Sequence, residues 1–207
     1  MFVHETLKTL KPLDIRSLLV SLFERLKPEA SFLRLYSTLI FNRFAFTLFE
    51  GVLYAMVMKT HGYTALTIAF AVNVFTMTTT LGLIGSGKLI DHVGSRIPII
   101  ASNLIWILAL LAYIFSGNLP LFFIAQILKG VSVALWDPAL NTHISSVTTE
   151  GDRGRITGKV GAFKGIFTFP APLIGATLFD VYGLNGPIIL SLLAVLISTL
   201  LSLGLKK

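Results

Sequence analysis

The most regular feature of the sequence is a series of six long apolar stretches separated by short polar connections. A helix that crosses a membrane needs about 20 consecutive, mostly apolar residues, and each stretch is close to that length. The spans are placed at 36–58, 64–84, 97–116, 120–146, 160–180 and 187–204. The pattern predicts an all-α protein, a polytopic transmembrane bundle of six helices.

Residues 1–35 precede the first span and follow a different pattern. Between Leu13 and Leu26, apolar residues recur at helical spacing and charged residues lie between them. This pattern is typical of an amphipathic helix at the interface between lipid and water, here on the cytoplasmic side. A solvated leader with no role beyond topology explains the segment equally well. Residues 36–207 are expected to form one transmembrane domain.

The composition supports a membrane protein and argues against two other classes. Hydrophobic residues make up 54% of the chain and charged residues 13%, against roughly 25% charged residues in soluble domains. The net charge of +7 is spread between the apolar runs, so nucleic acid is not an expected partner. An enzyme finds little support, because the four His residues are scattered and no nucleophile with a base or phosphate-binding loop appears. No metal or cofactor is expected, and the chain has no cysteine.

The positions of Lys and Arg predict the orientation in the membrane. Outside the spans, these residues lie in the lead, in the second and fourth connections and at the carboxyl end, whereas only Lys59 lies on the other side. Basic connections remain in the cytoplasm. Both termini are therefore expected to be cytoplasmic, which six spans permit, and the protein is expected in the cell membrane.

Polar groups inside the spans are unevenly distributed. The first, second, fourth and fifth spans contain charged or amide side chains or a run of threonines, whereas the third and sixth are almost wholly apolar. Charges within a bilayer are costly and usually face a bundle interior or a watery path. We expect the first group of helices to surround a polar path and the third and sixth to face lipid. The candidates for solute binding or coupling are Asn42, Arg43, Glu50, Lys129, Asp137 and Lys164.

Depth along the helices predicts which charges meet. At about 1.5 Å of rise per residue, Arg43 of the first span lies level with Asp137 of the fourth. Glu50 lies level with Lys129, nearer the outside. Two ion pairs between these spans are predicted, with Lys164 as a rival partner for Asp137. The alternative is that water in the path satisfies each charge separately.

Two motifs carry a resemblance to a known family. The connection after the second span contains Gly87, Leu89, Asp91, Gly94 and Arg96, with His92 where a basic residue is usual. It resembles the signature loop of the major facilitator superfamily. Further on, the sequence from Gly130 through Asp137-Pro138 to an Arg-Gly loop at 153–155 resembles the fourth helix of that family and its following loop. The resemblance covers nearly everything after residue 36.

The family resemblance implies a fold and a mechanism. Its members have two six-helix halves, each an inverted repeat of three helices, and this chain resembles the amino-terminal half. Two departures put proton-driven drug export in doubt, namely Gln126 where those exporters carry Arg, and alanines within their fifth-helix glycine motif. Residues expected to serve close helix packing are Gly130, Pro172 and Gly175.

Two functions remain in competition. The leading hypothesis is a secondary transporter that moves a small solute by alternating access together with a second six-helix half, either a separate chain or a second copy. In the family, the signature Asp also contacts that half. The alternative is a non-transporting membrane protein, a truncated remnant or an assembly subunit. Gln126 and the missing second half favour the alternative, whereas Asp91, Arg96 and the buried charges oppose it.

Overall fold

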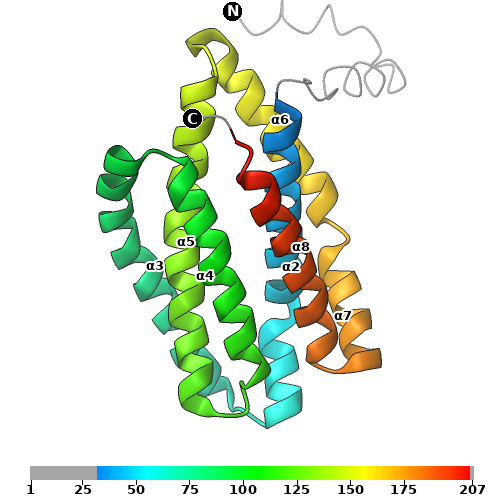
Figure 1. Ribbon diagram of the computed structural model, residues 1–207. Coiled ribbons are helices and arrows are strands. Elements are labelled where there is room, and N and C mark those ends of the chain that lie inside the picture. Colours follow the sequence, from blue (N-terminus) through cyan, green and yellow to red (C-terminus); the bar gives the residue numbers. More distant parts are fainter. Residues whose placement is uncertain (1–31, 206–207) are drawn as a thin grey trace, which may run out of the picture.

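The computed structural model describes residues 32–205, and these residues form helices joined by short turns (Figure 1). The helices are α2 (Leu33–His61), α3 (Ala65–Val93), α4 (Arg96–Ile114), α5 (Leu119–Val147), α6 (Glu150–Thr168), α7 (Ala171–Tyr182) and α8 (Asn185–Ser202). Six segments are long and apolar enough to cross a membrane, with α6 and α7 together forming the fifth. The interfacial helix expected within the lead lies outside the described residues, and α2 begins at Leu33, slightly before the expected boundary.

Two helices extend beyond the expected spans. Helix α3 continues to Val93, so most of the connection expected at 85–96 is helical, and the turn is confined to Gly94 and Ser95. Gly94 adopts a φ of +76°, a conformation that glycine adopts without a Cβ clash. Helix α6 likewise begins at Glu150, where a connection was expected. The length of an apolar stretch reflects the thickness of the bilayer alone, whereas the helix itself can continue beyond the bilayer into water.

The fifth span is broken between α6 and α7. Phe169 and Pro170 separate the two helices, because proline lacks the backbone N–H that would continue the helical bonding. After the break, α7 lies close to α2. A Cβ at Gly175 would clash with the backbone of Leu48, and a Cβ at Gly51 would lie 3.0 Å from the Pro172 side chain. Small residues therefore let these two helices approach closely.

The helices form a bundle in which α2 and α5 are central. In Figure 1, α4 and α8 lie in front, and they pack against one another and against α5 and α2 respectively. Helix α3 packs on α5 at one edge, and α6 and α7 pack on α2 at the other. Aromatic rings fill the space behind α4. The centre of the Trp106 ring lies 5.2 Å from that of Phe46 and 6.3 Å from that of Phe49.

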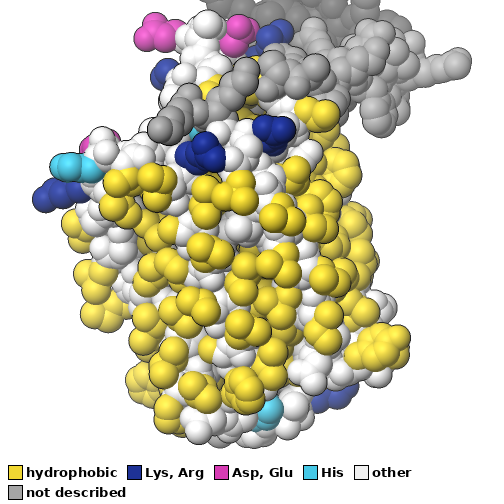
Figure 2. Space-filling view, viewed as in Figure 1, with side chains coloured by type: hydrophobic (Ala, Val, Ile, Leu, Met, Phe, Trp, Pro, Cys, Tyr) yellow, Lys and Arg dark blue, Asp and Glu magenta, His cyan; other side chains and the backbone are white. Residues whose placement is uncertain are grey.

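Helices α4 and α8, the third and sixth spans expected to face lipid, have apolar, exposed outer faces and inner faces that pack within the bundle. Ser102 and Ser132 exchange hydrogen bonds between α4 and α5. Ser191 and Ser198 of α8 each donate a 2.9 Å bond to a carbonyl of α2. Serine hydroxyls that bond to a neighbouring backbone permit close approach, so these two helices bury their inner faces. Only their outer faces are apolar and exposed, and they form part of the hydrophobic belt in Figure 2.

The two ends of the bundle differ in charge. The end where α2 begins carries Arg34, Lys88, Arg96 and Arg153, and it is called the basic end below. The opposite end carries Lys59, which forms an exposed ion pair of 3.6 Å with Asp180. Figure 2 shows charged side chains gathered at both ends and few across the belt between them. This division is that of a protein surrounded by lipid.

Candidate functional site: a charged face between the two central helices

Two ion pairs join α2 to α5. Arg43 pairs with Asp137, and about two helical turns further along Glu50 pairs with Lys129. The structure thus contains both pairs that depth along the helices predicts, and each links a residue of α2 to a residue of α5. The charged side chains therefore connect α2 with α5 at the centre of the bundle.

Lys129 occupies an enclosed position. Its side chain is 0% exposed, whereas that of Glu50 is 27% exposed. The Lys129 ammonium also donates a 3.1 Å hydrogen bond to the Tyr54 hydroxyl. It lies 4.1 Å from the centre of the Phe75 ring, a distance at which a cation is attracted to the aromatic face. Three helices, α2, α3 and α5, therefore contribute to the site of one ammonium group.

Arg43 has a similar arrangement nearer the basic end. Its guanidinium lies 5.8 Å from the Trp136 ring, and its side chain is 11% exposed while that of Asp137 is 48% exposed. Lys164 of α6 is exposed. Within residues 32–205 the structure gives Lys164 no ion pair. Lys164, the rival partner expected from the sequence, therefore forms no ion pair with Asp137, and Asp137 pairs with Arg43.

The charged groups open onto one side of the bundle. Helices α4 and α8 cover α2 and α5 on the side drawn in front in Figure 1. Glu50, Asp137 and Lys164 are therefore reached from the other side, between α3 at one edge and α6 and α7 at the other. This surface is called the open face below. On it the carboxylate is the more accessible member of each ion pair.

Asn42 lies away from the open face. Its side chain is buried and donates a 2.8 Å hydrogen bond to Asn103 of α4, which in turn donates a 3.2 Å bond to Ser198 of α8. This chain of bonds joins three helices in the interior of the bundle. The structure therefore places this candidate in helix packing, apart from the charges. Its neighbour Arg43 is rotated by about 100° around the same helix.

The signature residues lie at the basic end. Gly87, Leu89 and Asp91 belong to the last turns of α3, Gly94 forms the turn, and Arg96 begins α4. Arg96 donates a hydrogen bond to the carbonyl of Leu203 and Arg34 donates one to Gly204, just beyond α8. Cations are favourable at helix carboxyl ends, where backbone carbonyls lack helical partners. The two arginines thus fix the end of the last helix.

Asp91 does not have the partners that its position in a tight loop would provide. It is exposed within the last turn of α3, and within residues 32–205 no hydrogen bond or ion pair involves it. A carboxylate in a tight loop can pair with an arginine or accept bonds from helix-end amides, and within residues 32–205 Asp91 does neither. The reason is that α3 extends past Asp91, while Arg96 is directed to α8.

The residues expected to serve helix packing all lie at close contacts between helices. A Cβ at Gly130 of α5 would lie 2.8 Å from the Thr78 side chain and 3.0 Å from the Phe75 carbonyl of α3. Pro172 contacts Gly51, and Gly175 contacts the Leu48 backbone, as described above. These contacts set the positions of α3 and α7 at the two edges of the open face.

Three aromatic residues belong to the site and were absent from the candidates drawn from the sequence. Tyr54 and Phe75 surround Lys129, and Trp136 lies beside Arg43. Tyr54 follows Glu50 by four residues, which places both on one side of a helix. Spacing of this kind is a usable signal for Tyr54. The position of Phe75 depends on the packing of α3 against α5, which the sequence pattern does not define.

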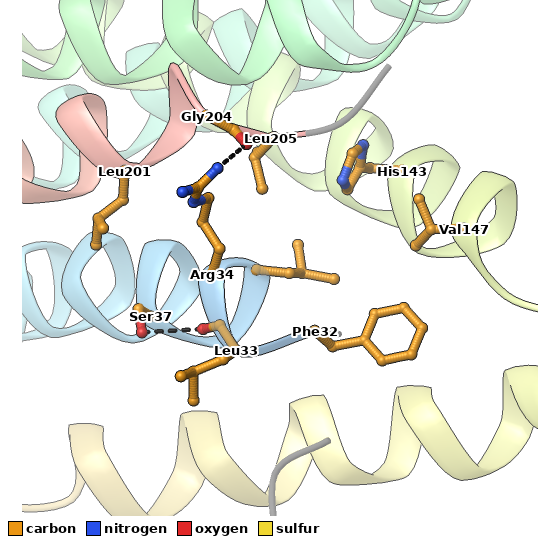
Figure 3. A pocket seen from close by; sticks show the side chains of 10 residues that line it. Phe32, Leu33, Arg34, Ser37, His143, Val147, Leu201, Gly204 and Leu205 are labelled. Atoms are coloured by element: carbon orange, nitrogen blue, oxygen red, sulfur yellow. Dashed lines mark hydrogen bonds between the residues drawn. The ribbon is translucent and has the colours of Figure 1, made fainter. Parts of the chain in front are cut away.

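A cavity of about 660 Å³ lies at the basic end, between the beginning of α2 and the ends of α5 and α8. Figure 3 shows Arg34 reaching across it to Gly204, with His143 and Val147 on the far wall. The Nδ1 atom of His143 and the hydroxyl of Ser95, in the turn before α4, form a hydrogen bond of 3.0 Å. The cavity is separate from the ion pairs, and its walls are the helix ends themselves.

These features define a class: a membrane-embedded bundle of six helices whose central pair carries charged groups on one uncovered face. Residues 35–206 match the family model described as Major Facilitator Superfamily. The chain belongs to the major facilitator superfamily.

Known relatives and a solved structure agree with this assignment. The chain is 27% identical over 157 residues, 72% of its length, to an uncharacterized MFS-type transporter of Methanocaldococcus jannaschii. It is 30% identical over 105 residues, 50% of its length, to a probable vesicular acetylcholine transporter-B of Danio rerio. It spans 40% and 21% of those proteins. The crystal structure of the POT family transporter PepTSo superposes with a TM-score of 0.69 over 82% of this chain and 36% of that one, at 13% identity.

Proposed function

We propose that this chain supplies one six-helix half of a secondary transporter, and that a small polar solute passes along its open face. The observation that supports this most directly is the accessibility of Glu50 and Asp137, which are 27% and 48% exposed in the middle of a lipid-facing bundle. Lipid is a poor environment for carboxylates. A water-filled path covered by a second bundle is the environment that suits them.

Both ion pairs suit a role in transport. Each pair has a cation held inside the bundle by an aromatic ring and a carboxylate directed to the path. A charged group of a solute, or a coupling ion, that reaches the carboxylate competes with the cation behind it. Binding is thereby coupled to the connection between α2 and α5, which is the kind of link that a transport cycle requires.

The proposed orientation places the basic end in the cytoplasm of the cell and Lys59 outside, following the bias of Lys and Arg across membranes. In transporters of this family, alternating access arises when two six-helix bundles rock around a site at their interface. A single bundle exposes its charged face permanently. The proposal therefore requires a second six-helix half and expects no saturable solute flux from a verified monomer in liposomes.

Accessibility to a thiol reagent tests alternating access without knowledge of the solute. Thr47 lies four residues after Arg43 and three before Glu50, and it is partly exposed, so it faces the same path midway between the pairs. In the assembled protein, Thr47→Cys is expected to react with a membrane-impermeant maleimide added from either side. Leu108→Cys on the lipid-facing side of α4, where Leu108 is 53% exposed, is the control and should react from neither side.

The competing function predicts a different result. A non-transporting subunit or remnant holds one conformation, so the introduced thiol at position 47 would react from one side at most. Labelling from a single side, in protein shown to be assembled and inserted in one orientation, would contradict transport by alternating access. The absence of a native cysteine means that no background labelling needs to be removed.

A further inference from the structure

The cavity at the basic end combines apolar walls with a few polar groups. Its volume of about 660 Å³ lies within the range of about 300–1,000 Å³ that is usual for sites of small ligands. Six of the ten residues that line it are apolar, namely Phe32, Leu33, Leu35, Val147, Leu201 and Leu205. The polar side chains are those of Arg34, Ser37 and His143 (Figure 3). Within the described residues no carboxylate lines this cavity, which is called the basic-end cavity below.

The Arg34 guanidinium is only partly used by the described part of the chain. A guanidinium carries five N–H donors. Within residues 32–205, that of Arg34 makes one hydrogen bond, to the carbonyl of Gly204, and no ion pair. Its planar fork of N–H groups matches the oxygen atoms of a phosphate or a carboxylate. An anionic group can therefore bind Arg34 while the bond to the end of α8 stays in place.

His143 contributes a second polar group from the opposite wall. The residue is 3% exposed, and Figure 3 shows its imidazole across the cavity from Arg34. Nδ1 is bonded to the Ser95 hydroxyl, whereas Nε2 forms no hydrogen bond with any described residue. Polar atoms of buried side chains are normally paired. In the tautomer in which Nδ1 accepts from Ser95, Nε2 carries a proton and can donate it to an oxygen atom of a ligand.

The basic-end cavity borders the membrane surface. It lies where α2 begins and where α5 and α8 end, which is the depth of the cytoplasmic headgroups under the proposed orientation. Leu33, which lines the cavity, is 53% exposed, and Leu203, next to Gly204 in the chain, is 49% exposed. Figure 2 shows basic side chains directly above the hydrophobic belt on the side of α4 and α8. An amphiphile can therefore reach the cavity from the bilayer, with its head among basic groups and its chain on apolar ones.

From these observations we infer that the basic-end cavity binds one anionic phospholipid of the cytoplasmic leaflet. Its phosphate accepts hydrogen bonds from Arg34 and from Nε2 of His143, and an acyl chain lies against the apolar walls. Basic pockets between membrane helices on the cytoplasmic side are a known mode of binding for anionic headgroups. A free phosphate ion shares the headgroup's chemistry, but it would leave the apolar walls uncovered. The inference goes beyond the proposed function and does not depend on transport.

The charge of the cavity selects among headgroups. All phospholipids have a phosphate, but choline and ethanolamine headgroups add a cation. Arg34 is positive and no carboxylate of residues 32–205 lines the cavity, so that cation would lack a partner and be repelled by the guanidinium. A glycerol headgroup carries no such charge. We therefore expect phosphatidylglycerol to bind more tightly than phosphatidylcholine.

Native mass spectrometry measures this preference directly. The purified chain is delipidated in mild detergent and titrated with dioleoyl-phosphatidylglycerol or dioleoyl-phosphatidylcholine, which have the same acyl chains. We expect one tightly bound phosphatidylglycerol per chain, with an affinity at least tenfold higher than that for phosphatidylcholine. Equal affinity for the two lipids would overturn the inference, because it would show that the charge of the cavity plays no part.

Two substitutions of the same chemical type separate the cavity from the general charge of the basic end. Arg34→Gln is expected to reduce the tenfold preference to less than threefold, whereas Arg34→Lys, which keeps the charge, should retain more of it. Arg153→Gln removes an exposed cation at the same end, on α6 and outside the cavity, and should leave the preference unchanged. No loss with Arg34→Gln, or an equal loss with Arg153→Gln, would contradict the site.

Two further variants test the opposite wall. His143→Phe keeps a ring but removes Nε2, and it should weaken the binding of phosphatidylglycerol at least threefold. Val147→Trp fills part of the cavity and should weaken the binding of both lipids. Thermal unfolding of the lipid-free proteins in detergent identifies the variants that are folded. Folded variants at both positions that bind phosphatidylglycerol like wild type would show that the lipid binds elsewhere, and would overturn the inference.

Two other occupants of the cavity would give different results. Glycerol 3-phosphate, the soluble part of the headgroup, should not displace the lipid even in large excess, and displacement would identify a soluble anion as the occupant instead. The double variant Leu18→Asp with Leu22→Asp interrupts the apolar pattern of the lead and should bind the lipid like wild type. Tenfold tighter binding by this variant would identify the lead as the occupant and overturn the inference. Thiol labelling at position 47 is independent of these results, so this inference and the proposed function can fail separately.

Discussion

The sharpest test of the charged site is a double-mutant cycle on Glu50 and Lys129. Glu50→Gln leaves the ammonium of Lys129, whose side chain is 0% exposed, with only the Tyr54 hydroxyl and the Phe75 ring as neutral partners. Breaking a buried ion pair costs about 3–5 kcal/mol. Because these partners remain and Glu50 is partly exposed, we expect a loss near the lower limit, about 3 kcal/mol.

The reverse substitution should cost less. Lys129→Met leaves Glu50 without its partner, but a carboxylate that is 27% exposed can recruit water, so we expect a loss of about 1.5 kcal/mol. The double variant leaves neither charge without a partner, and its expected loss is about 2 kcal/mol, which gives a coupling energy of about 2.5 kcal/mol. The measurement is the free energy of unfolding in mild detergent for all four proteins.

An exposed ion pair provides the control for this cycle. Lys59 and Asp180 lie 3.6 Å apart with side chains 71% and 69% exposed, and such pairs contribute about 0–1 kcal/mol. The cycle of Lys59→Met with Asp180→Asn should therefore show coupling below about 0.5 kcal/mol. If Glu50 and Lys129 also coupled by less than about 0.5 kcal/mol, the charges would act independently and the assignment of a buried pair would be refuted.

Three further results are expected. The cycle of Arg43→Met with Asp137→Asn should show a smaller coupling of about 1 kcal/mol, because Asp137 is 48% exposed; a coupling larger than that of Glu50 with Lys129 would contradict the argument from burial. Asp152→Cys should be labelled in cells only from the cytoplasm and Asn118→Cys only from outside, and the reverse pattern would overturn the proposed orientation. Gly130→Ala should lower the free energy of unfolding by about 1–3 kcal/mol, since its Cβ would lie 2.8 Å from Thr78, whereas Gly85→Ala should not lower it.

The parts of this structure that the sequence predicts are those governed by the cost of transfer into lipid. Six apolar stretches give six spans, because each must satisfy its backbone within a layer of fixed thickness. The pairing of Arg43 with Asp137 and of Glu50 with Lys129 follows from the cost of isolated charges and from depth along the helices. The spans and the ion pairs both depend on position along the membrane normal, and the residue number supplies that position directly.

The parts that the sequence does not predict depend on rotation and packing. Ser102, Ser191 and Ser198 looked compatible with lipid-facing spans, yet they bond to neighbouring helices and bury one side of α4 and α8. The difference arises because a serine in an apolar run can satisfy its hydroxyl on its own helix or on a neighbour, and hydropathy does not distinguish these cases. Phe75 was missed for a similar reason, because its place in the site depends on the close packing of α3 on α5 at Gly130.

The two sides of the central helices are held by different forces, and this bears on how the protein works. On the side of α4 and α8, α2 and α5 are fixed by serine-to-backbone bonds and by the rings around Trp106, which are short contacts that tolerate little movement. On the open face, the same two helices are joined by long charged side chains whose carboxylates are accessible. Under the proposed function, a solute that binds there would replace a contact of the second kind and leave the first intact. The proposal therefore predicts that the bundle moves as one body against the proposed second half, and that the ion pairs are the part of it that responds to binding.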